Sequence, residues 1–81
     1  MIHERTGLIL QETIRHLKKT RLEKELSHDA LATLARVSRP AVSHIENGRR
    51  KPTLLMALKI AHGLGVDLST ILHTAEKANP K

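Results

Sequence analysis

Apolar residues recur at helical spacing along the start of the chain. Leu10, Ile14 and Leu17 follow one another at steps of four and three residues, which puts them on one face of a helix. Charged residues such as Glu12 and Lys19 lie off that stripe, as in a helix that buries one side and exposes the other. The pattern therefore predicts a first helix from about Gly7 to Glu23.

Two short helices joined by a tight turn follow. Ser27 stands where a hydroxyl can cap the first of them, and Ser38 stands in the same position before the second. The second helix ends at Asn47 and Gly48, because glycine accepts the left-handed conformation that closes a helix. The apolar faces of this pair comprise Leu31, Leu34, Ala35, Val42 and Ile45.

Two more helices are expected after a basic loop. Thr53 begins a helix that Gly63 and Gly65 bring to an end, with Leu54 and Leu58 available for burial. A last short helix follows and carries three apolar residues. These are Leu68, Ile71 and Leu72.

The composition suits one small domain built from aliphatic side chains. The chain has 81 residues, no cysteine and no aromatic residue, so neither a disulfide nor a Cys-based zinc site can support its core. We expect an all-α fold with one compact domain at residues 10–73. Residues 1–9 form an N-terminal extension that includes the start of the first helix, and residues 74–81 a flexible C-terminal tail.

The residue types that carry catalysis or bind metals are not grouped. The six histidines are scattered, without a His-x-x-x-His pair, and the chain lacks the motifs of serine hydrolases and of phosphate-binding loops. We therefore expect no enzymatic activity, no metal and no cofactor. No apolar run approaches the ~18 residues of a membrane span, and the N-terminus lacks an apolar signal core, which favours a cytoplasmic protein with no membrane partner.

The charge distribution points to nucleic acid. Lys and Arg number 14 against 8 Asp and Glu, a net charge of +6. Residues 36–51 hold five of these cations and one acid, whereas a solvated helix face usually mixes both signs. Proteins that bind single strands usually stack bases on aromatic side chains, which this chain lacks. A duplex is therefore the more natural partner than a single strand.

Several motifs in this pattern resemble a known family. They are the stretches 31–32 (LA), 37–39 (VSR), 42–49 (VSHIENGR), 51–54 (KPTL) and 60–66 (IAHGLGV). Together they look like the helix-turn-helix domain of the Cro/C1 repressor group, also called the Xre family, over about Leu10 to Leu72. The resemblance implies a five-helix, lambda-repressor-like bundle in which helices two and three form the helix-turn-helix.

The resemblance also implies a function. Such a domain binds double-stranded DNA sequence-specifically and regulates transcription, with repression as the expected outcome. Its recognition helix, here about residues 38–47, lies in the major groove with its N-terminal residues at base edges. On the DNA, such regulators are nucleoid-associated in bacteria. The alternative hypothesis is an antitoxin, or another regulator, that uses the same fold chiefly to bind a partner protein.

The outward side of the predicted recognition helix supplies candidate base contacts. Arg39 can take guanine O6 and N7 bidentately, or instead contact a phosphate. His44 is equally open between a base edge and a phosphate. Ser38 can contact DNA as well as cap the helix, and Ala41 can touch a thymine methyl or only fill space.

A second set of residues is expected to contact phosphates, which positions the domain without reading sequence. The set comprises His28, Ser43, Asn47, Arg49, Arg50 and Lys51. His28 stands where the family usually has glutamine, and histidine can also donate to a phosphate. For Arg50, simple solvation is the alternative.

Two further residues are implied to be structural, and one departs from the family pattern. Arg21 and Glu46 occupy positions that form an ion pair in the family, between the first helix and the end of the recognition helix. Arg36 occupies a turn position that is often glycine, because the turn there tends toward the left-handed conformation.

The expected partners are duplex DNA and a second copy of the chain. One helix-turn-helix contacts a short half-site, so specific affinity usually needs two copies roughly 34 Å apart. The last helix is a candidate dimer seam, although Leu68, Ile71 and Leu72 could instead close the monomer core. A toxin or a co-regulator remains a further candidate partner.

Overall fold

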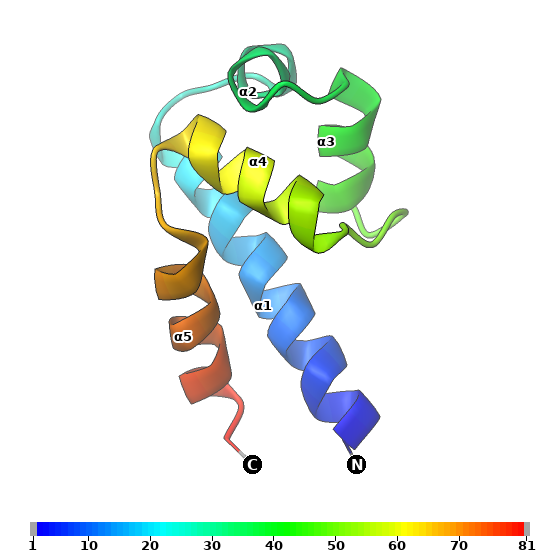
Figure 1. Cartoon of the computed structure of the whole chain (residues 1–81). Coiled ribbons are helices and arrows are strands. Elements are labelled where there is room, and N and C mark those ends of the chain that lie inside the picture. Colours follow the sequence, from blue (N-terminus) through cyan, green and yellow to red (C-terminus); the bar gives the residue numbers. More distant parts are fainter. Residues whose placement is uncertain (1, 81) are drawn as a thin grey trace.

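The computed structural model describes residues 2–80, and side chains from residue 4 to residue 80. Five helices, with no strand in the described residues, make the all-α fold that the sequence predicts. They are α1 (Ile2–Glu23), α2 (His28–Ala35), α3 (Arg39–Glu46), α4 (Leu54–Leu64) and α5 (Leu68–Ala78). In Figure 1, α5 runs beside α1, while α2 and α3 gather at the other end of the bundle.

The first and last helices are longer than the sequence predicts. Helix α1 begins at Ile2 instead of near Gly7, and α5 continues to Ala78 through the expected flexible tail. Within this segment Ala75 is completely buried, and Asn79 Nδ2 donates a hydrogen bond to the Ala75 carbonyl at 3.0 Å. Met1 and Lys81, which belong to the predicted extension and tail, lie outside the described residues.

Hydroxyl caps begin three of the helices. Ser27 Oγ accepts a hydrogen bond from the Ala30 amide at 3.0 Å, and Ser38 Oγ accepts one from the Ala41 amide at 3.2 Å. Thr53 caps α4 in the same way, whereas Asp67 occupies the cap position of α5 without such a bond. Each hydroxyl cap satisfies one amide that the helix itself cannot pair, which fixes where the helix starts.

Arg36 turns the chain between α2 and α3 in the left-handed conformation. Its φ and ψ are 57° and 46°, in the region that glycine prefers. The Val37 amide donates to the Ala32 carbonyl at 3.0 Å, which closes α2 around this residue. The turn therefore has the left-handed conformation that the resemblance implies. A residue with a side chain is less stable in this conformation than glycine by about 1 kcal/mol or more.

The core lies where α2, α3 and α4 meet the second half of α1. The largest fully buried side chains are Leu31, Val42, Ile45 and Leu64. Three leucines expected in the core are instead exposed, namely Leu34, Leu54 and Leu58. Other residues of the same helices fill the core instead, namely Leu31, Ala32 and Ala35 of α2 and Ala57, Ile60, Ala61 and Leu64 of α4.

Gly63 lies inside α4 and does not end it. A Cβ at this position would stand 2.9 Å from the Ala35 amide nitrogen, closer than packed atoms approach. The glycine therefore lets α4 lie directly against the last turn of α2. Gly65, with φ of 72°, closes the helix.

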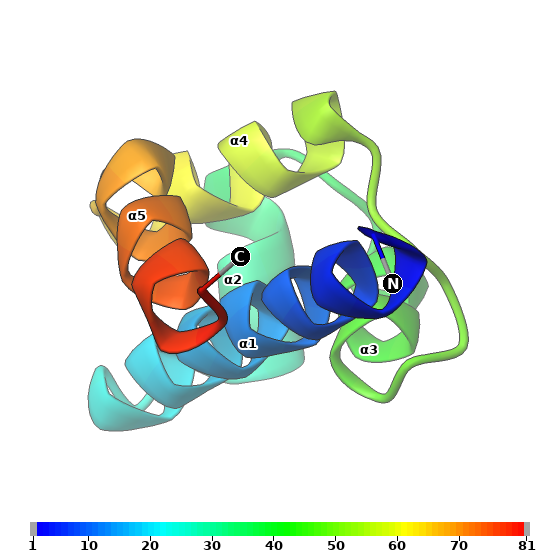
Figure 2. The same cartoon turned by 90° about the horizontal axis from the view of Figure 1, so that it is seen from below.

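No single helix in the described residues is long and apolar enough to cross a membrane. Only α4 and α5 taken together reach that length and composition, and they meet at an angle of 111°. Figure 2 shows this bend, with α4 crossing the bundle and α5 turning back along α1.

Candidate nucleic-acid interface

Helix α3 has a buried side and an outward side. Val42 and Ile45 point into the core, while Ser38 and Arg39 are exposed at the start of the helix. Ser43 and His44 are half-buried, and Asn47 is exposed just beyond the last turn. The outward side thus brings together polar groups that can donate to or accept from DNA.

Ala41 does not belong to the outward side. Its side chain is 1% exposed, so its methyl group cannot touch a thymine methyl. Ala41 precedes Ile45 by four residues, which puts both on the same helix face. The prediction of a base contact at Ala41 is therefore wrong, and Ala41 contributes to packing.

Arg39 begins α3 beside the first turn of α2. Its Nε lies 3.4 Å from Asp29 Oδ1, and the two side chains are 65% and 75% exposed. A pair this exposed is weak, because water screens both charges. The guanidinium can therefore leave Asp29 for another acceptor at small cost.

Arg21 and Glu46 join α1 to the end of α3. Arg21 Nε donates to Glu46 Oε2 at 2.7 Å, and Arg21 Nη2 donates to Glu46 Oε1 at 2.9 Å. Arg21 Nη1 also donates to the Leu26 carbonyl at 2.7 Å. The two side chains are 9% and 10% exposed, so this bidentate pair is shielded from water.

His28 is a third partner of this pair. Its Nε2 lies 3.2 Å from Glu46 Oε1, and its ring is half-buried. Burial alone raises the pKa of the Glu46 carboxyl, but the hydrogen bonds from Arg21 and His28 outweigh it. They hold that pKa below its usual value of 4.5, so Glu46 is ionised at neutral pH.

The loop after α3 is ordered by its own backbone. The Arg49 and Arg50 amides both donate to the His44 carbonyl, at 2.9 and 3.1 Å. Asn47 Oδ1 accepts from the Arg49 amide at 3.1 Å, which leaves the Asn47 Nδ2 group free to donate outward. Arg49, Arg50 and Lys51 are all exposed, so the loop presents three cations next to the end of α3.

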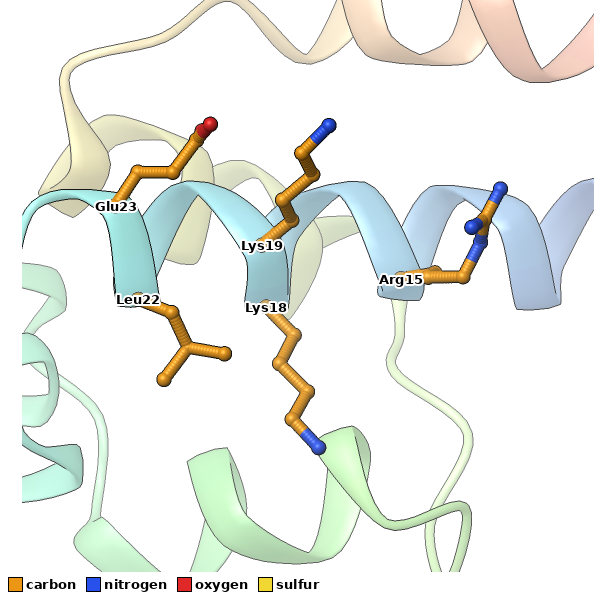
Figure 3. Close-up of a pocket in the computed structure, with 5 residues that line it drawn as sticks. All are labelled: Arg15, Lys18, Lys19, Leu22 and Glu23. Atoms are coloured by element: carbon orange, nitrogen blue, oxygen red, sulfur yellow. The ribbon is translucent and has the colours of Figure 1, made fainter.

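Lys18 of α1 lies beside the outward residues of α3, although the sequence did not predict it as a site residue. It shares a surface depression with His28, Ser43 and Asn47. Figure 3 shows its side chain leaving α1 on the side of α3, while Lys19 leaves on the opposite side. The available signal was spacing, since Lys18 precedes Arg21 by three residues and so shares its helix face.

The described residues contain no group of three or more His, Asp or Glu side chains that could hold a metal ion. The predicted DNA-contact residues lie on α3 and at its two ends, at the start of α2 and in the loop after α3, while Arg21 of the predicted ion pair lies on α1.

Comparison with known proteins identifies the fold. The helix-turn-helix family matches residues 17–71. The HTH-type transcriptional regulator YqaF of Bacillus subtilis (strain 168) is 43% identical over 51 residues, which cover 63% of this chain and 67% of that protein. The control protein C.MunI of Mycoplasma sp is 42% identical over 62 residues, covering 75% and 84% of the two chains.

A solved structure agrees with these relatives. The chain is similar to a mutant of the restriction-modification controller protein C.Esp1396I, with a TM-score of 0.75, 30% sequence identity, and coverage of 83% of this chain and 87% of that one. The family match spans more than half of the 81 residues. The chain therefore belongs to the helix-turn-helix family of DNA-binding transcriptional regulators, in the Cro/C1-type group that its sequence resembles.

Proposed function

We propose that this regulator represses transcription by reading a specific duplex sequence with α3 in the major groove. The observation that carries the proposal is the outward side of α3, where polar residues stand opposite the buried Val42 and Ile45. Exposed cations continue this surface into the loop after α3. The proposal assigns the chain no enzymatic activity, and its DNA target implies a cytoplasmic location.

The side chains on this surface divide into candidates for base contacts and candidates for phosphate contacts. Arg39 is the best donor for a guanine edge, because its guanidinium is exposed and only weakly held by Asp29. Ser38 and His44 flank the same side of α3 and are the other candidate readers. Phosphate contacts are assigned to the polar and basic groups around them, namely His28, Ser43, Asn47, Arg49, Arg50 and Lys51.

Selection of bound duplexes from a random pool tests this function. The expected result is a defined half-site, repeated with two-fold symmetry, whose affinity falls steeply as salt rises because bound phosphates release counterions. A reporter gene placed behind the selected site then gives the sign of regulation, which we expect to be lower expression. Absence of duplex binding even at low salt, or enrichment of no sequence, would overturn the proposal.

The active form is proposed to be a homodimer that uses the outer face of α4. Leu68 is buried, and Ile71 and Leu72 pack against the core, so α5 offers less free apolar surface than expected. The first turns of α4 instead expose Leu54 and Leu55. A second copy that covers these leucines removes them from water, which is the usual driving force for association.

Sedimentation equilibrium tests the dimer. Leu55→Glu places a charge in the proposed seam and should give a monomer, while Leu22→Glu, an equally exposed leucine on α1, should leave the dimer intact. The proposal of a dimer fails if the wild-type chain stays monomeric at concentrations where it binds its selected site. If both variants have the same oligomeric state, the dimer interface does not lie on the outer face of α4.

A further inference from the structure

A depression on the surface is formed where three helices meet. It is lined by residues from α1, α2 and α3, namely Lys18, Arg21, His28, Ser43, Glu46 and Asn47. We call it the α1–α3 depression. Lys18 also lines a neighbouring hollow along α1 that reaches Asn47 and Gly48.

The base of the α1–α3 depression is electrically balanced. Both oxygens of Glu46 are hydrogen-bonded, to Arg21 at 2.7 and 2.9 Å and to His28 at 3.2 Å. The Arg21 charge therefore cancels the Glu46 charge. Lys18 forms no ion pair within the described residues, so it adds one uncompensated positive charge at the rim.

Residues that carry hydrogen-bond donors line the same depression. Ser43 lines it from α3 and Lys18 from α1, and their side chains end in a hydroxyl and an ammonium. Asn47 contributes its Nδ2 group, because its Oδ1 already accepts from the Arg49 amide at 3.1 Å. One positive charge with two neutral donors suits a singly charged oxyanion with several acceptor oxygens.

We propose that the α1–α3 depression binds one backbone phosphate of the DNA duplex. Lys18 supplies the charge, and Ser43 and Asn47 donate hydrogen bonds to the phosphate oxygens. This inference rests on the proposed function and deepens it, because it extends the DNA contact surface from the helix-turn-helix onto α1. The contact fixes the distance between α1 and the DNA strand that borders the major groove, which sets how deeply α3 enters.

A pair of adjacent lysines provides the test. Lys18→Ala and Lys19→Ala each remove one exposed ammonium from α1, but only Lys18 borders the depression. On the selected duplex, Lys18→Ala should weaken binding about tenfold at low salt. It should also lower by about 1 the steepness with which the logarithm of the binding constant falls with the logarithm of the salt concentration, which we call the salt slope. Lys19→Ala should change affinity less than about twofold, as a remote charge does once screened. Lys18→Arg keeps the charge and should keep the slope.

Neutral methylphosphonate at each backbone position in turn locates the contact. One position should weaken wild-type binding strongly and hardly affect Lys18→Ala, while Lys19→Ala responds as the wild type does. Such coupling identifies a direct partner, because independent sites give additive effects.

The possible failures are distinguishable. Equal effects of Lys18→Ala and Lys19→Ala, or no methylphosphonate position coupled to Lys18, would overturn the phosphate site while the wild type still selects a defined duplex. A wild type that binds no duplex would overturn the proposed function itself, and the phosphate site with it.

Discussion

The two ends of α3 are held in opposite ways. At its C-terminal end, Glu46 is shielded from water and hydrogen-bonded to Arg21 and His28. At its N-terminal end, Arg39 reaches Asp29 across 3.4 Å with both side chains largely exposed. Each end thus carries an ion pair, but only one of the pairs is protected from solvent.

This difference distinguishes the end of α3 that is fixed to α1 from the end that is proposed to contact bases. A buried bidentate pair has little freedom and fixes the helix relative to α1, whereas an exposed pair exchanges partners readily. Under the proposed function, the end of α3 that contacts base edges is the end whose charged group is exposed and weakly held. Four changes test whether this division holds.

The largest effect is expected from Arg21→Ala. The change leaves Glu46 half-buried without its main partner and the Leu26 carbonyl without a donor. The free energy of unfolding in urea should fall by about 3–5 kcal/mol, as when one partner of a buried pair is removed. Arg15→Ala, which removes the partner of Glu12 on the exposed side of α1, is the control and should change little. Similar losses in both variants would contradict the anchoring role.

Acid should weaken the same end of α3. The pKa of Glu46 is lowered in the folded chain, so its contribution to stability is present above its usual value of 4.5 and is lost as pH falls through the lowered pKa. The stability gap between the wild type and Glu46→Gln should therefore narrow as the pH falls from neutral to 3. It should stay below the loss in Arg21→Ala, because Arg21 retains its bond to the Leu26 carbonyl. A gap that is independent of pH would rule out a lowered pKa of Glu46 in the folded chain.

Arg39→Ala should act on DNA and not on the fold. Binding to the selected duplex should weaken by about 1–3 kcal/mol, with the guanine preference lost at one position. Unfolding in urea should be nearly unchanged, because the side chain is exposed. Lys77→Ala, a cation on the exposed side of α5, is the control for net charge. Uniform weakening across all sequences would make Arg39 a phosphate contact instead.

Asp29→Asn should give the smallest effect. The free energy of unfolding should change by about 0–1 kcal/mol, as for exposed pairs. Duplex binding should become slightly tighter at low salt, because Arg39 loses a competing acceptor, and the gain should vanish at high salt. Weaker binding would instead show that Asp29 orients Arg39 toward DNA.

Local chemistry made the starts of α2, α3 and α4 predictable. The hydroxyls of Ser27, Ser38 and Thr53 cap helices where the sequence predicts, because a cap depends only on its own next three residues. Gly65 ends α4 for a similarly local reason. The all-α fold follows from these signals and from the aliphatic composition.

Burial was harder to predict because it depends on distant neighbours. Leu54 and Leu58 resemble core residues in sequence, yet the facing helices leave that side of α4 open. Ala75 lies in a polar segment but is fully buried. Lys18 was missed as a site residue because its place beside Ser43 depends on how α1 packs against α3, and its spacing from Arg21 is the one local signal.

Gly63 has a consequence for how specificity can evolve. The missing side chain lets the backbones of α2 and α4 nearly touch, and the left-handed Arg36 passes the position of α2 directly to α3. A larger residue at 63 would force the backbones of α2 and α4 apart. Under the proposed function, we expect the resulting shift of α2 to move α3 relative to α1, and so to change target preference without any exchange of an outward residue of α3.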